Sequence, residues 1–202
     1  TCALPICPEY RVRYWAKREL SQRDPQAVAS ALDAWVSQLA ADDPRLRHHQ
    51  LEALWTCRTL STENTALLKE LLNCEEHHAR AAATTQLRYI DLPDRIEQLR
   101  ARANDENGLV RMEAVIAASY IGTEDALNAV LGVLDRPMGD HLTYAVRTAL
   151  GSEVTRRHGQ TGLPDGRIVF DHQHAVSLKR DLIAASALVA TRSEEHTSEL
   201  QS

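Results

Sequence analysis

Pairs of histidines are the residues in this sequence that come closest to a metal-binding pattern. His48–His49 and His77–His78 are adjacent pairs, and His172 and His174 follow Asp171 with one residue between them. A protein metal site needs three or four convergent ligands. Adjacent residues on a helix diverge by about 100°, so each pair offers one ligand at best. Both histidines of the third group share a side if the segment is extended, but we expect a polar linker there rather than a metal site.

Cysteines and tryptophans offer two further kinds of chemistry. Cys2, Cys7, Cys57 and Cys74 form no C-x-x-C motif and no zinc-type spacing. Cys57 and Cys74 fall within helical patterns, so we expect two buried free thiols, and a disulfide between them has no local support. The three tryptophans are evenly spaced along the chain and could form a stacking platform for bases or sugars. Each lies in an amphipathic segment, which favours packing between helices; they are Trp15, Trp35 and Trp55.

Composition and missing motifs narrow the function further. There is no P-loop, no G-x-S-x-G and no G-x-G-x-x-G motif. The acidic pairs Asp42–Asp43 and Glu75–Glu76 open helices, where negative charge suits the helix dipole, so they indicate capping rather than acid–base catalysis. A net charge of −5 gives no support to a nucleic-acid surface. No apolar run approaches the roughly 20 residues that span a bilayer.

The elements that carry these residues are helices, because apolar residues recur at helical spacing from about residue 9 to residue 154. In "DPQAVASALDAWVSQLA", Asp24 and Pro25 are suited to the N-cap and first helical positions, and an apolar stripe follows. Asp43 and Pro44 give the same start signal. Thr123 predicts the cap of a further helix, whose apolar stripe runs from Leu127 past Val130 to Leu134, and Gly122 predicts the end of the helix before it. The 44% apolar content with only 4% aromatics is typical of closely packed helices rich in alanine and leucine.

These helices recur with a period. Arg47, Arg80 and Arg111 follow one another at a nearly constant spacing, and one further step of the same length leads to Leu142. Apolar or small residues occupy the positions four and seven residues after each anchor. Such a period predicts a helical solenoid, in which each hairpin buries its apolar face against its neighbours. A helical bundle without repeat symmetry is the alternative.

The anchor pattern, in which Asp, often Pro, an apolar residue and Arg precede an alanine/leucine stripe, resembles the HEAT-repeat family. "DDPRLRHHQLEALW" and "DENGLVRMEAVIAAS" carry it best, and Leu142 departs from it. The resemblance implies an all-α, right-handed solenoid that binds partners along its concave face. It also implies a structural role for the arginines, which cap or bridge neighbouring repeats.

Five blocks in order carry a narrower resemblance: "YRVRYWAKREL", "HHQLEALW", "ARAAATTQLRY", "VRMEAVIAASY" and "MGDHLTYAVRTAL". Together they are similar to the HEAT segment of large bacterial PVC-type membrane-bound dehydrogenases, also called haem-binding domain proteins. That family has a β-propeller upstream and a C-x-x-C-H cytochrome domain downstream, which implies c-type haem and a periplasmic or cell-envelope location for the parent protein. Neither the propeller nor C-x-x-C-H occurs here, so no catalytic, haem-binding or metal-binding residue carries over.

We therefore expect a non-catalytic scaffold that contacts protein, either neighbouring domains of its parent or a separate partner. We further expect a docking face on the basic N-terminal helix, formed by Tyr10, Arg13, Tyr14 and Arg18. A free-standing HEAT adaptor is the second hypothesis. The third is an enzyme on a HEAT scaffold, similar to a bilin lyase or a DNA glycosylase, and the negative net charge disfavours the glycosylase.

Both ends of the sequence read as translated sequencing adapter. "RSEEHTSELQS" at residues 192–202 and "TCALPI" at residues 1–6 can be encoded by one adapter and its reverse complement. With no initiator Met, we expect a fragment whose native part begins near Cys7 and ends near residue 191. The predicted organisation is a solenoid over residues 7–154, a linker with a possible short strand over 155–177, and a truncated helix over 178–191.

Overall fold

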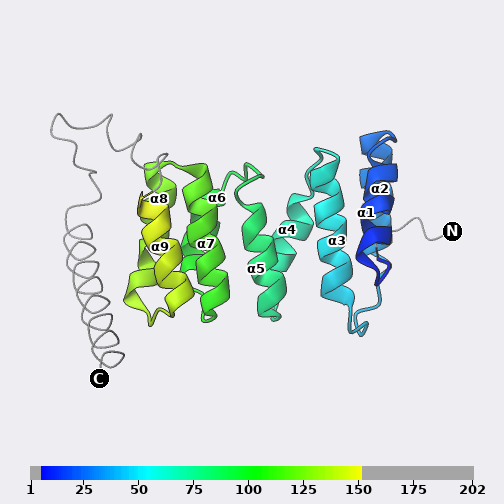
Figure 1. Ribbon diagram of the computed structural model, residues 1–202. Helices are drawn as coiled ribbons and strands as arrows, with labels where there is room; N and C mark the ends of the chain where they lie inside the picture. Colours follow the sequence, from blue (N-terminus) through cyan, green and yellow to red (C-terminus); the bar gives the residue numbers. More distant parts are fainter. Residues whose placement is uncertain (1–5, 152–202) are drawn as a thin grey trace, which may run out of the picture.

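The computed structural model describes residues 6–151, and this part of the chain is helical throughout, with short connecting loops (Figure 1). The predicted linker at 155–177, the predicted helix at 178–191 and the two adapter segments lie outside the described residues. The elements are α1 (Tyr10–Leu20), α2 (Pro25–Val36), α3 (Leu46–Thr59), α4 (Thr65–Leu72), α5 (His77–Gln86), α6 (Arg95–Ala103), α7 (Gly108–Ile121), α8 (Glu124–Val130), the 3-10 helix η1 (Leu131–Asp135) and α9 (Asp140–Gly151).

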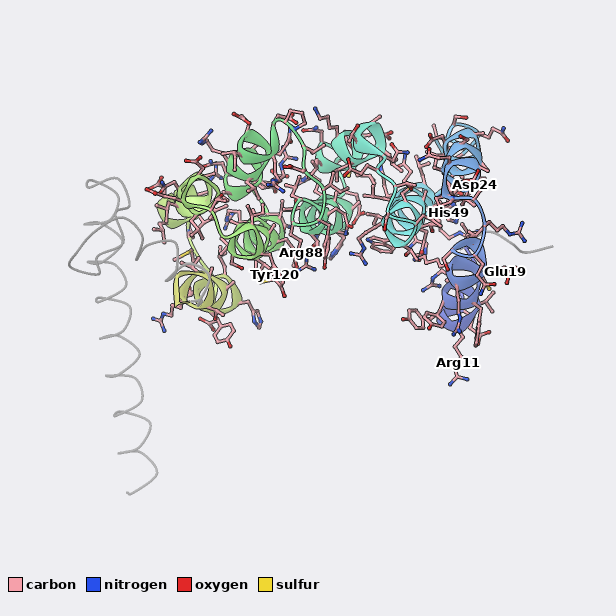
Figure 2. All side chains as sticks on the ribbon, turned by 90° about the horizontal axis from the view of Figure 1, so that it is seen from above. Arg11, Glu19, Asp24, His49, Arg88 and Tyr120 are labelled. Carbon is pink, nitrogen blue, oxygen red and sulfur yellow. The ribbon has the colours of Figure 1, made fainter. Side chains whose placement is uncertain are left out.

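The helices form two layers that run the length of the described chain (Figure 2). The outer layer contains α2, α4, α6 and α8, and the inner layer contains α1, α3, α5, α7 and α9. In the inner layer α3 packs on α5, α5 on α7 and α7 on α9, and in the outer layer α6 packs on α8. The two ends of the inner layer project to the same side, which makes its outward surface concave (Figure 2). The prediction of an all-α solenoid is confirmed for these residues.

Local sequence signals explain most helix ends. The Asp24 carboxylate accepts a hydrogen bond from the backbone N–H of Gln26, and Pro25 occupies the first position of α2. The Thr123 hydroxyl caps α8 in the same way. Gly122 ends α7 with a φ of 69°, a left-handed conformation that favours glycine. These three predicted boundaries are therefore confirmed.

Two predicted boundaries were wrong. Helix α3 begins at Leu46, not at Pro44, because the Asp43 side chain accepts the backbone N–H of Arg45 (2.8 Å) and holds a turn before the helix. The helix predicted to continue past Val130 instead tightens into η1. Gly132, a poor helix former, lies there against the Asn104 side chain, and a Cβ would approach that side chain to 3.3 Å.

The core runs between the two layers. On the outer side it consists of leucines at helical spacing; Leu68, Leu71, Leu72 and Leu99 are fully buried. On the inner side it is rich in alanine, since α5 and α7 bury Ala79, Ala83, Ala114, Ala117 and Ala118 completely. Small side chains let neighbouring inner helices approach closely. Replacing one of these leucines with alanine typically costs about 2–5 kcal/mol.

Within residues 6–151, no helix is both long and apolar enough to cross a membrane.

Candidate functional site

The repeat anchors Arg80 and Arg111 bind the loop that precedes their own helix with the same geometry. Nη1 of Arg80 donates to the carbonyl oxygens six and five residues earlier, at 2.9 and 2.7 Å. Nη1 of Arg111 donates to the carbonyl oxygens at the same two offsets, both at 2.9 Å. A guanidinium has five N–H donors in a rigid fork, so further donors remain for the next repeat.

Those remaining donors tie each repeat to its neighbour. Nε and Nη2 of Arg80 bind the two carboxylate oxygens of Asp105, in the loop before α7, at 2.9 and 3.0 Å. Nη2 of Arg111 donates to the carbonyl oxygen of Pro137, in the loop before α9, at 2.9 Å. Both guanidinium groups are therefore joints between consecutive repeats.

Asp105 completes the first of these joints. Burial by itself raises the pKa of Asp105, but the hydrogen bonds from Arg80 and from the backbone N–H of Asn107 outweigh it. The pKa of Asp105 is therefore held below its ordinary value. The carboxylate stays ionised at neutral pH, as a bidentate arginine pair requires.

The other two predicted anchors behave differently. Arg47 lies at the surface, where its Nη1 donates to Gln50 and to the Glu70 carboxylate, each at 2.8 Å. It binds no loop carbonyl at the offsets used by Arg80 and Arg111. Leu142 is buried in the core and packs there as an apolar side chain.

Arg13, which the sequence placed on a docking face, has the geometry of an anchor. Its Nη1 donates to the carbonyl oxygens six and five residues earlier, both at 2.7 Å, and its Nε pairs with Glu52 of α3 at 2.9 Å. The sequence signal was its position about one repeat length before Arg47. Tyr10, Tyr14 and Arg18 are exposed on α1, and their docking role stays a prediction.

Glu52 is a buried carboxylate that attaches α1 to α3. Arg13 and Lys17 hold it from α1, with Nζ of Lys17 at 2.6 Å from Oε2. His48, one turn earlier on α3, lies 3.7 Å away from the same carboxylate. Desolvation lowers the pKa of His48, and Glu52 opposes that shift only in part.

The histidine pairs do not converge on a common point. His49 is buried and His48 is exposed, as expected for adjacent residues on one helix. The rings of His77 and His78 lie 4.1 Å apart at the start of α5. Within the part of the chain that the structure describes, no three His, Cys, Asp or Glu residues could hold a metal ion together. His172 and His174 lie outside the described residues.

The prediction of buried thiols at Cys57 and Cys74 is confirmed. Both are free, and burial raises the pKa of each thiol, which keeps them protonated and unreactive. The prediction of packed tryptophans is confirmed for Trp35 and Trp55, which pack partly buried against the core. It was wrong for Trp15, which is 60% exposed on α1.

A stack of arginine and tyrosine side chains crosses three repeats on the inner face, and the sequence reading missed it. The guanidinium carbons of Arg58 and Arg88 lie 4.7 and 4.8 Å from the ring centroid of Tyr89. Arg88 also lies 4.7 Å from the ring centroid of Tyr120. Figure 2 labels Arg88 and Tyr120 on the side of α5 and α7 that faces away from the outer layer. We call these four residues the arginine–tyrosine stack.

Exposed aromatic side chains of the described chain gather on the inner layer. Among residues 6–151 the exposed large hydrophobic residues come from α1, α7, α9 and the end of α5, and none comes from an outer helix. They are Tyr10, Tyr14, Trp15, Tyr89, Tyr120 and Tyr144. Exposed aromatic residues that concentrate on one layer are more typical of a binding surface than singly scattered ones.

An open hollow of about 530 Å³ lies beside the Arg80 joint. It is lined by charged and polar residues of both signs, among them Arg102, Glu106 and Arg136. Its central pair, Arg80 and Asp105, is already saturated by hydrogen bonds. The hollow is thus a polar seam between loops and not a ligand pocket of the usual apolar kind.

The comparisons with known proteins agree with this geometry. Residues 64–151, which include α4 to α9, match the family model described as HEAT repeats. Neither the curated proteins nor the solved structures gave a significant match. The matched part contains the Arg80 and Arg111 joints and Leu142, and it supports the HEAT-repeat resemblance over these residues.

Proposed function

We propose that this chain is a non-catalytic scaffold whose concave inner face binds another protein. The observation that carries the proposal is the gathering of exposed tyrosines and Trp15 on the inner layer, while no outer helix of the described chain exposes a large hydrophobic side chain. Aromatic residues and arginine dominate the energetics of protein interfaces. HEAT repeats are in general non-catalytic interaction scaffolds, and the match over residues 64–151 supports that role.

The proposal is tested by capture from a lysate of the source cells with variants of each face. Replacing Tyr14 and Tyr144 with serine removes two exposed aromatics from the inner layer. Replacing Glu97 and Arg100 with serine alters two exposed residues of α6 in the outer layer and leaves the net charge unchanged. We expect the inner-face variant to lose specific partners that the outer-face variant keeps. Equal capture by both variants would refute binding at the inner face.

We further propose that this scaffold is one segment of a larger bacterial protein of the dehydrogenase–cytochrome c type. It would hold the electron donor and acceptor domains together in the periplasm or cell envelope. The five sequence blocks in their order support it. The test is the complete coding sequence of the gene: a β-propeller upstream and C-x-x-C-H downstream are expected. A gene that encodes only repeats contradicts this proposal and favours the free-standing adaptor.

A further inference from the structure

We propose that the arginine–tyrosine stack binds an extended acidic segment of the partner protein, through carboxylates that pair with Arg58 and Arg88. This rests on the proposed function, because it names the chemistry of the segment that the inner face takes. The stack runs from the end of α3, past the end of α5, to the end of α7. It thus joins three repeats along one line.

The guanidinium groups of the stack have donors to spare. Neither Arg58 nor Arg88 forms an ion pair with a carboxylate of residues 6–151. Among residues 6–151, the one polar side-chain contact of Arg58 is a long one, 3.5 Å from its Nη1 to the Gln86 amide oxygen. The tyrosine rings hold both groups by cation–π contact. A guanidinium held in this way still offers paired N–H groups, which match a carboxylate bidentately and cost less entropy to order.

The surroundings of the stack favour a negatively charged ligand. Helices α3, α5 and α7 contain two acidic residues between them, Glu52 and Glu113. Glu52 is buried and already paired with Arg13 and Lys17. Glu113 accepts a hydrogen bond from the Thr85 hydroxyl at 2.7 Å. Few carboxylates are thus free to repel an acidic segment at this face.

The arrangement suits a peptide better than a nucleic acid. Binding of a single strand relies on bare aromatic faces for base stacking and on a continuous basic groove. Here Tyr89 is contacted by two guanidinium groups and Tyr120 by one.

The spacing of the repeats sets the length of the peptide. Packed helices lie about 10 Å apart, so α3 to α7 span roughly 20 Å. An extended chain rises about 3.3 Å per residue, so about seven residues cover the stack. A fluorescently labelled peptide of about eight residues that alternates Glu and Gly is therefore a suitable probe, with the Gln-for-Glu peptide as its neutral match.

The experiment titrates this peptide with the full chain and follows fluorescence anisotropy at low salt. We expect the Glu peptide to bind and the Gln peptide not to bind. The double variant R58Q/R88Q should weaken binding at least about tenfold, since it removes two charge-assisted contacts. The control R45Q/R100Q removes the same charge from two exposed arginines outside the stack and should leave binding within about twofold. Binding should also weaken with added salt.

Three results would overturn the inference. The Glu peptide fails to bind, or both double variants weaken it equally, or a single-stranded oligonucleotide of similar length binds more tightly through the stack. The capture experiment with the inner-face tyrosine variant separates the two proposals. If that variant still loses its partners, each of these three results rejects only the acidic ligand, and the proposed protein-binding function is retained. If capture is equal for the two faces, the proposed function itself fails.

Discussion

Arginines make two different kinds of contact in this molecule. Those at the loop edge, where consecutive repeats meet, bind backbone and carboxylate groups, and those on the inner face pack against tyrosine rings. At the loop edge, Arg80 and Arg111 each bind two backbone carbonyls of their own repeat and at least one group of the next. On the inner face, Arg58 and Arg88 lie against tyrosine rings and pair with no described carboxylate. In the first pair, Nη1 and Nη2 donate to groups of the protein, whereas in the second pair the one side-chain hydrogen bond within residues 6–151 is that of Arg58 to Gln86.

If the stack binds as proposed, stability and binding depend on separate arginines of the same chain. A buried, saturated guanidinium stabilises the stacking of repeats, because its removal leaves buried partners without hydrogen bonds. Arg58 is exposed and Arg88 is partly exposed, so their removal should cost less, because it breaks cation–π contacts and leaves no described ion pair broken. Substitutions at the two places should therefore have opposite signatures.

The largest stability effect is expected at the joint between the repeats of α5 and α7. Replacing Arg80 with glutamine leaves Asp105 buried without its partner and two loop carbonyls without a donor. We expect the free energy of unfolding to fall by about 3 kcal/mol. Urea denaturation followed by circular dichroism measures it. The exposed R100Q variant is the control and should stay within about 0.5 kcal/mol of wild type.

The same joint should be sensitive to acid. Because the folded pKa of Asp105 lies below its ordinary value of 3.8, the carboxylate stabilises the fold above that value. This contribution is lost as the pH falls through the folded pKa. We expect D105N to be less stable than wild type at pH 7 by about 2 kcal/mol, with the gap closing below about pH 4. A gap that stays constant from pH 7 to pH 3 would show that the charge of Asp105 contributes nothing.

A smaller loss is expected where α1 attaches. Glu52 is buried between Arg13 and Lys17, which are themselves partly exposed. E52Q should therefore lower the free energy of unfolding by about 2 kcal/mol, less than at Arg80 because water reaches both cations. Hydrogen exchange should locate the loosening in α1, whose amides would lose protection while those of α7 keep it. Uniform loss along the chain would argue against a local attachment.

The smallest change in the free energy of unfolding is expected at the partly exposed anchor Arg47. Its partner Glu70 is more than half exposed, so the pair is screened by water and salt. R47A should change the free energy of unfolding by at most about 1 kcal/mol, and salt should erase the change. An effect as large as that at Arg80 would mean that the repeat position, rather than burial, decides the contribution.

The helical fold and two of the repeat anchors could be predicted from the sequence, because their signals are either local or periodic. Caps at Asp24 and Thr123 and the left-handed Gly122 are local signals, so they could be predicted without knowing the packing. The period of the repeats found Arg80 and Arg111. The anchor role of Arg13 was missed because it depends on α1 being an inner helix, which the apolar pattern of one short helix does not specify.

The arginine–tyrosine stack was missed although a signal was present. Tyr89 and Tyr120 follow the anchors Arg80 and Arg111 at the same offset, so the repeat register alone places them at equivalent positions. The contact of Arg88 with both rings depends on side-chain direction at the ends of α5 and α7. Periodicity predicts equivalent positions but not which long side chains meet between them.

The most direct test of this division measures binding and stability on the same preparations of R58Q/R88Q and wild type. We expect the variant to bind the alternating Glu peptide at least about tenfold more weakly, while its free energy of unfolding falls by at most about 1.5 kcal/mol through the lost cation–π contacts. Unchanged affinity, or a stability loss as large as that of R80Q, would contradict it.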